Sequence, residues 1–234
     1  MYRAYVHTPD ARWIGPRKIC LAVCCILPGP EAVAFNRRWK QLFLRNEISL
    51  SQTIDWARVE KRRLGDVDLR EMFARAFRST EALNFIVGIE KDTWSSLESA
   101  RRQFGNAEDF CLLRAVRLAM DRFETVEEAA RASLIVEAGP KTMLRRTKFV
   151  LRMHESDSRA ADHITTVKFA TPRQDHVFGA LSLLVQMSGM GTLGMDDDPE
   201  SLALRLPEGS VLEFWDAAFA ERHWAAVEWS METL

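Results

Sequence analysis

Hydrophobic residues recur along the chain with two different periods, and each period predicts one kind of element. Residues 2–7 and 19–27 are rich in apolar and β-branched residues, and a stretch with two prolines and a glycine separates them. This pattern predicts a β-hairpin. A helix is expected from Glu31, because apolar residues recur at i, i+4, i+7 and i+8 from Phe35.

Three further apolar runs of strand length follow, at residues 85–89, 133–138 and 164–169. Helical patterns precede or follow each of them, and the expected helices cover residues 93–105, a segment from 109, residues 141–153 and residues 176–190. Five strands among these helices predict an α/β domain, built on a mixed five-stranded sheet flanked by helices.

The last part of the chain differs in character. Glycines and the run Asp196-Asp197-Asp198 predict a linker, and residues 211–229 predict an acidic helix that carries five aromatic residues. We therefore divide the chain into an α/β domain over residues 1–190 and an acidic, helical C-terminal extension over residues 191–234. The extension is expected to pack on the domain; docking onto a second copy of the chain stays open.

The charge is nearly balanced overall, with 32 basic and 33 acidic residues, but it is divided along the chain. Residues 1–152 hold 27 basic and 19 acidic residues, whereas residues 153–234 hold 5 and 14. A basic body with an acidic end indicates a nucleic-acid surface guarded by an acidic segment, two complementary protein surfaces, or the ordinary solvation of one fold. The candidate contacts to a phosphate backbone are the basic residues of two predicted helices: Arg37, Arg38, Lys40, Arg145, Arg146 and Lys148.

The sequence predicts a cytoplasmic protein without a membrane-spanning helix. Its N-terminus lacks the features of a signal peptide, and its longest apolar run, at residues 19–27, is too short to cross a bilayer. The four cysteines lie in apolar segments without the paired spacing of a zinc site, so we expect reduced thiols.

Common enzyme motifs are missing from the sequence. It contains neither a phosphate-binding G-x-x-x-x-G-K-[ST] nor a G-x-S-x-G elbow. Acidic residues at predicted strand ends are the remaining candidates, because carboxylates there can hold two divalent cations and activate water for phosphodiester cleavage. The candidates are Asp10, Glu137 and Asp175, with Mg²⁺ or Mn²⁺ as the metal; each is equally explained as a turn, edge or cap residue.

Four segments, at residues 4–10, 53–56, 85–91 and 169–184, fall in the order of an uncharacterised bacterial RNase H-like family, the domain of unknown function 3800. The chain resembles this family over about residues 2–188. The resemblance implies an RNase H-like fold. Members of the family begin with a strand like Tyr-Ile-Asp-Glu-Ser-Gly and end with a helix that contains Gln-Leu-Ala-Asp.

The chain departs from this family at the acidic positions. His7 and Thr8 stand where the resemblance implies Asp and Glu, and Leu181 stands at the last Asp. Magnesium prefers oxygen ligands, which Leu181 lacks. The resemblance therefore implies that hydrolysis is lost, or relocated to a set of nearby titratable residues: His7, Asp10, Glu137, Asp175 and His176.

Three functions remain open. The first is an RNase H-like protein without metal-dependent nuclease activity and without a cofactor, which binds nucleic acid or a protein. The second is a metal-dependent nuclease with a rearranged carboxylate site. The third is a structural protein that self-associates, through its C-terminal helix.

Overall fold

The computed structural model describes residues 1–9, 13, 17–47, 63–64, 67–68, 72, 75–76, 81–126, 131–156, 162–193 and 209–232. The strands of the main sheet are β1 (Tyr2–His7), β2 (Ile19–Pro28), β5 (Leu83–Glu90), β6 (Ala132–Glu137), β7 (Ile164–Ala170) and β8 (Val211–Trp215). A separate short ladder joins β3 (Arg63–Leu64) to β4 (Val67–Asp68). The helices are α1 (Gly29–Arg45), α4 (Lys91–Ser96), α5 (Glu98–Phe104), α6 (Ala107–Val126), α7 (Met143–Ser156), α9 (Val177–Leu193) and α11 (Ala217–Glu232).

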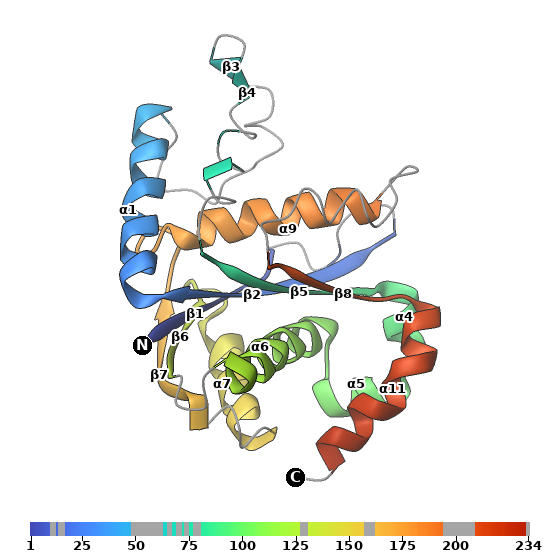
Figure 1. The fold of residues 1–234 in the computed structure, drawn as a ribbon. Coiled ribbons are helices and arrows are strands. Elements are labelled where there is room, and N and C mark those ends of the chain that lie inside the picture. Colours follow the sequence, from blue (N-terminus) through green and yellow to red (C-terminus); the bar gives the residue numbers. More distant parts are fainter. Residues whose placement is uncertain are drawn as a thin grey trace.

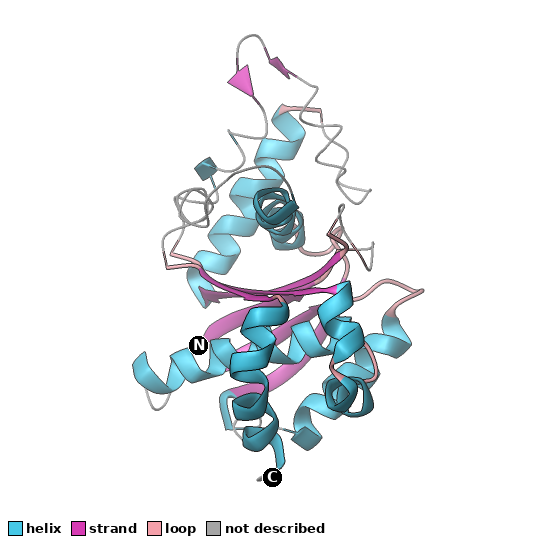
Figure 2. Ribbon diagram, turned by 90° about the vertical axis from the view of Figure 1, so that its right-hand side faces the viewer, coloured by secondary structure: helices cyan, strands magenta, loops and turns pink. Residues whose placement is uncertain are grey.

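The main sheet is mixed and has the order β7-β6-β1-β2-β5-β8. Strands β1, β2 and β5 are antiparallel neighbours, β6 and β7 continue parallel to β1, and β8 is parallel to β5. Helices α1 and α9 lie on one face of the sheet, and α6 and α7 lie on the other (Figures 1 and 2). The predicted α/β class and hairpin are confirmed, but the sheet has six strands where the sequence predicted five.

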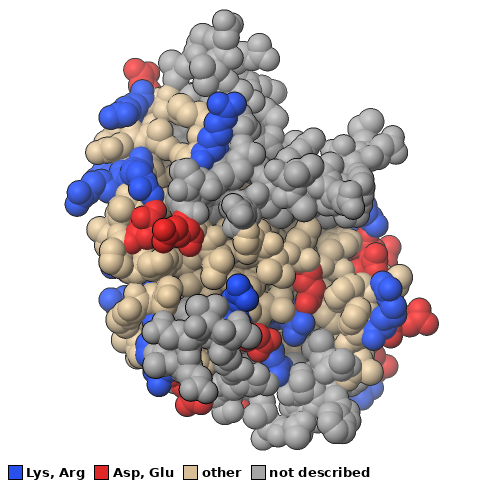
Figure 3. All heavy atoms as spheres, viewed as in Figure 1, with Lys and Arg blue, Asp and Glu red and all other residues tan. Residues whose placement is uncertain are grey.

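Helix α1 begins two residues before its predicted start at Glu31. Pro30 is accommodated in the first turn, where the missing N–H has no intrahelical acceptor to lose. Phe35, Trp39 and Phe43 of the predicted stripe are buried and Leu42 is half-buried, whereas the exposed side of the helix is basic. Lys and Arg side chains gather over this helix in the space-filling view (Figure 3).

The C-terminal part corrects the predicted helix at residues 211–229. Val211 to Trp215 form a strand that pairs with β5, and the helix starts only at Ala217. Asp216 explains the boundary, because its Oδ1 accepts a hydrogen bond from the Phe219 amide at 2.7 Å and so caps the new helix. Helix α11 packs on its own chain, where the Trp224 indole donates to Ser99 Oγ at 2.8 Å.

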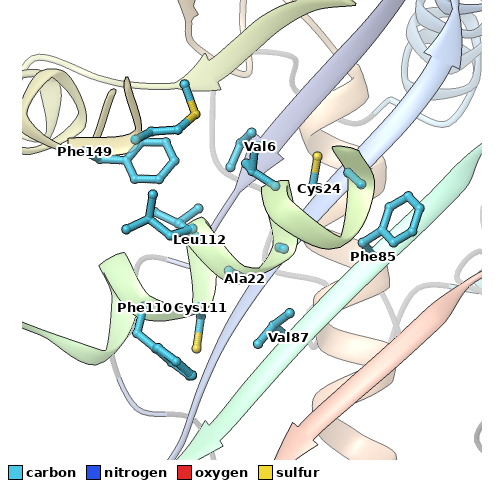
Figure 4. Close-up of a cluster of buried hydrophobic side chains, with 14 of the residues drawn as sticks. Val6, Ala22, Cys24, Phe85, Val87, Phe110, Cys111, Leu112 and Phe149 are labelled. Atoms are coloured by element: carbon cyan, nitrogen blue, oxygen red, sulfur yellow. The ribbon is translucent and has the colours of Figure 1, made fainter. Parts of the chain in front are cut away.

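Two hydrophobic cores fill the two sides of the sheet. Strand β1 contributes to both, because successive side chains point to opposite faces. Val6 joins the core under α6 and Tyr5 joins the core under α1 and α9. Figure 4 shows the first core, where Phe110 and Leu112 of α6 lie against the sheet.

All four cysteines are buried and free, as the sequence predicted. No helix within the described ranges is long and apolar enough to span a membrane.

Candidate functional site

The carboxyl ends of β1 and β6 bring together two residues that lie 130 positions apart in the sequence. The strands are parallel, and Val6 pairs with Val136, so His7 and Glu137 are neighbours at the same edge of the sheet. His7 Nδ1 bonds to Glu137 Oε2. Both were candidate catalytic residues, and the structure places them in direct contact.

The partner of His7 fixes the tautomer of its ring. A carboxylate can only accept, so Nδ1 carries a hydrogen, and in the neutral form of the ring Nε2 keeps the lone pair. The ring is buried, and Nε2 has no hydrogen-bond partner within the described part of the chain. A carboxylate that orients an imidazole in this way leaves Nε2 available as a base or as a metal ligand.

A second polar network lies one residue further along the chain. Thr8 Oγ1 donates to Glu108 Oε1 at 2.8 Å, and Arg146 Nη2 donates to Thr8 Oγ1. Glu108 is also ion-paired with two arginines: Arg146 Nη1 lies 2.7 Å from Oε1, and Arg145 Nη1 lies 2.7 Å from Oε2. Each oxygen of the Glu108 carboxylate therefore faces a guanidinium group.

Arg146 joins the two networks. Its Nε donates to the main-chain carbonyl of Glu137 at 3.2 Å, while its other nitrogens face Thr8 and Glu108. The residue is only 4% exposed. The sequence placed Arg146 among the contacts to nucleic acid, but a guanidinium with this burial and these partners is a structural cation of the site.

Glu108 was not among the sequence candidates. It lies in the first turn of α6, where acidic residues are common because they favour the positive end of the helix dipole. Its position at the helix start is sufficient to explain an acidic residue, and no sequence signal predicts its hydrogen bond to Thr8, which lies 100 positions away.

Asp175 and His176 lie just before α9. Asp175 Oδ1 accepts from the amide of Val177, the first residue of this helix, at 3.2 Å, which is an Asx-turn contact. Burial raises the pKa of the Asp175 carboxyl, and the nearby Tyr5 and Arg3 oppose this rise. These two neighbours lie at the middle and beginning of β1, whereas His7 lies at its end.

His176 faces α1. Its amide donates to Asn36 Oδ1 at 2.8 Å, and its ring packs edge-on against Phe43 with a centroid distance of 6.2 Å. Burial lowers the pKa of the imidazole, and Lys40 adds to this effect. The residue thus ties the loop before α9 to α1.

The three predicted metal ligands, Asp10, Glu137 and Asp175, do not form a complete ligand set among the described residues. Asp10 lies outside the described residues, and Asp175 has other neighbours than Glu137. No group of three or more His, Cys, Asp or Glu side chains within the described ranges is placed to hold a metal ion. Glu108 and Leu181 also fit a magnesium pair poorly, because the Glu108 carboxylate is paired with two arginines and the Leu181 side chain is buried and apolar.

The predicted basic residues fall on opposite faces of the sheet. Arg37, Arg38 and Lys40 are exposed on α1, and Arg38 pairs with Glu31. Of the three predicted basic residues on α7, Arg145 and Lys148 are exposed, and Arg145 is held by Glu108. The exposed face of α1 is therefore the stronger basic surface of the two.

Comparison of the chain with protein-family models, with curated proteins and with solved structures found no match.

Proposed function

We propose that this protein is an RNase H-like domain that has lost metal-dependent nuclease activity and binds the phosphate backbone of nucleic acid through α1. The sheet topology supports the fold assignment. Three antiparallel strands, β1, β2 and β5, precede two strands that run parallel to β1, and a closing helix, α9, returns to the other face. This is the order that the sequence resemblance implies.

The observation that carries the loss of hydrolysis is the position of Arg146. Its guanidinium supplies positive charge beside Thr8 and Glu108, at the edge where a nuclease of this fold would need cations. A divalent ion brought there would be repelled by Arg146 and Arg145 and would find the Glu108 oxygens already paired. His7 adds a nitrogen, a ligand that magnesium disfavours.

The binding function rests on α1. Arg37, Lys40 and Arg45 share the exposed side of this helix with Arg38. Such a surface attracts phosphates without reading bases, because it carries no motif that enters a groove. We expect weak, sequence-independent binding that falls steeply with salt.

The nuclease assay tests the first half of the proposal. The purified protein is incubated with DNA, RNA and hybrid duplexes in the presence of Mg²⁺ or Mn²⁺, beside a Glu137→Ala variant. We expect the two proteins to be indistinguishable from buffer. Cleavage by the wild type that the Glu137→Ala variant lacks would support the rearranged nuclease and refute our proposal.

The salt dependence of binding tests the second half. Replacing Arg37, Arg38 and Lys40 with Ala should reduce the slope of log K against log salt by about 2 to 3 for duplex DNA. The matched control removes three exposed basic residues elsewhere: Lys91, Arg101 and Arg102. Equal effects of the two triple variants would show that α1 is not the contact surface.

A further inference from the structure

Helix α1 turns all of its aromatic side chains away from its basic side. Phe35, Trp39 and Phe43 are 1%, 0% and 3% exposed. Their rings pack on one another, with Phe35 stacked on Trp39 at a centroid distance of 5.4 Å and Phe43 edge-on to Trp39 at 5.8 Å. The cations of the helix lie on its exposed side, which we call the basic face: Arg37, Arg38, Lys40 and Arg45.

The burial of these rings bears on the form of nucleic acid that the basic face suits. Proteins that bind single strands stack the bases on exposed aromatic side chains, and each stacked base tightens binding by about fivefold to a hundredfold. The basic face offers a single strand contacts to phosphates alone. In a duplex the bases are already stacked on one another, and the phosphates are the part that a cationic surface reaches.

The spacing of the cations also favours a duplex. Arg38 and Arg45 are seven residues apart, so they lie on one side of the helix and about 10.5 Å apart along its axis. Over about 10 Å of its own axis a duplex carries about six phosphates, whereas one of its strands carries about three. The duplex therefore brings more negative charge within reach of the same cations.

The basic face belongs to a helix that is fixed on the body of the protein. The His176 amide donates to Asn36 Oδ1 at 2.8 Å, and the His176 ring packs against Phe43. On the exposed side, Glu31 pairs with Arg38. Cations held at a fixed spacing match phosphates that are also held at a fixed spacing, because a flexible single strand loses conformational entropy when it is ordered on a rigid surface.

We propose that the basic face of α1 binds double-stranded nucleic acid in preference to single strands, because the aromatic rings of the helix lie in the core. This inference rests on the proposed function and adds the form of nucleic acid that the same surface takes. Duplex DNA and duplex RNA share the phosphate chemistry on which the argument depends. The preference therefore concerns the number of strands and not the sugar.

Fluorescence anisotropy of the full chain with labelled duplexes and their separate strands tests the preference. A DNA duplex, an RNA duplex and the four single strands have equal length and are compared at one salt concentration. We expect a duplex to bind at least about tenfold more tightly than its own strands, and the Arg37→Ala/Arg38→Ala/Lys40→Ala variant to lose most of this difference. The control is the triple variant of Lys91, Arg101 and Arg102, which should keep it.

Two results overturn the inference in distinguishable ways. If single strands bind as tightly as both duplexes and the α1 variant still loses this binding, the preference is refuted while the proposed α1 surface stands. If the α1 variant binds every probe as the wild type does, the proposed surface itself is refuted, and the preference with it.

A substitution that adds an exposed ring tests the cause. Leu44 is 59% exposed on α1, so Leu44→Trp places an aromatic side chain among the cations. Single-strand binding should tighten by at least about fivefold, with duplex binding changed by less than about twofold. The matched control is Leu144→Trp on α7, where the leucine is 72% exposed and on the opposite face of the sheet (Figures 1 and 2). An unchanged ratio of duplex to single-strand affinity in Leu44→Trp would overturn the role given to the buried rings.

Discussion

The bond between Glu213 and Arg114 anchors the last strand of the sheet. Glu213 lies on β8 and faces α6, where Arg114 Nε donates to Oε1 at 2.7 Å and Nη2 donates to Oε2 at 2.8 Å. The Trp215 indole donates to the same Oε1 at 2.7 Å. The side chains of Arg114 and Glu213 are 20% and 11% exposed. We predict that Glu213→Ala is the most damaging single truncation of an ionic side chain in the C-terminal part.

The magnitude follows from burial and geometry. A hydrogen bond to a charged group contributes about 1.5 to 3 kcal/mol, and Glu213→Ala removes three of them. Water can reach part of the Arg114 guanidinium, which offsets some of the loss. We therefore expect the free energy of unfolding to fall by about 2 to 4 kcal/mol, with Tm lowered by about 2 to 4 °C for each kcal/mol.

Urea unfolding of a double-mutant cycle gives the measurement. Glu213→Ala, Arg114→Ala and the double variant should show a coupling energy of about 1.5 to 3 kcal/mol. The control is the exposed pair Arg102–Glu98, with side chains 78% and 68% exposed, for which Glu98→Ala should cost less than about 0.5 kcal/mol. Similar losses for Glu213→Ala and Glu98→Ala would refute the argument that burial makes the first pair strong.

Three further predictions concern packing, pH and the polar network. Gly88→Ala places a Cβ 2.7 Å from a leucine carbon of β2 and should destabilise by about 1 to 3 kcal/mol in urea unfolding, whereas Gly139→Ala meets nothing within 4 Å and should leave the midpoint unchanged. Because the pKa of Asp175 is raised in the folded state, the fold loses stability as pH rises above the ordinary Asp range; Asp175→Asn should raise Tm at about pH 7, and a gain that persists at about pH 3 would contradict this. Arg146→Met should destabilise by about 3 kcal/mol, because it leaves buried polar partners uncompensated; a variant as stable as the wild type would show that the guanidinium is dispensable.

The sequence predicted those elements whose apolar period is long and regular. Helix α1 follows from the spacing of Phe35, Trp39 and Phe43, all of which are buried. The sequence did not predict strand β8, because a run of five mostly apolar residues is compatible with both the helical and the strand period of hydrophobicity. Glu213 and Trp215 alternate with the residues between them, as in a strand. This alternation determines the structure only in the folded protein, where β8 pairs with the edge of β5.

The sequence predicted part of the site's membership, His7 and Glu137, but neither Glu108 nor the contacts among the members. His7 and Glu137 were named in one larger set of titratable residues, but their direct contact depends on the parallel pairing of β1 and β6, which no local pattern specifies. Arg146 was assigned to the wet face of its helix, although it shares a spacing of three and seven residues with buried Phe149 and Met153. This spacing predicts that Arg146 lies on the buried face of the helix. We assigned it to the surface instead because its side chain is charged.

The pairing of β5 with β8 has a consequence for synthesis on the ribosome. Paired residues of these two strands, such as Phe85 and Val211, lie 126 positions apart in the sequence, the same separation as the bonded pair Asn84 and Ser210. Every other strand of the main sheet is translated before β8, so the nascent chain carries β5 as a bare sheet edge until residues 211–215 emerge. An unpaired apolar edge is a template for association between chains, and closing a loop of this length slows folding. The period between the synthesis of β5 and that of β8 is therefore when the nascent protein is most exposed to aggregation and to chaperones.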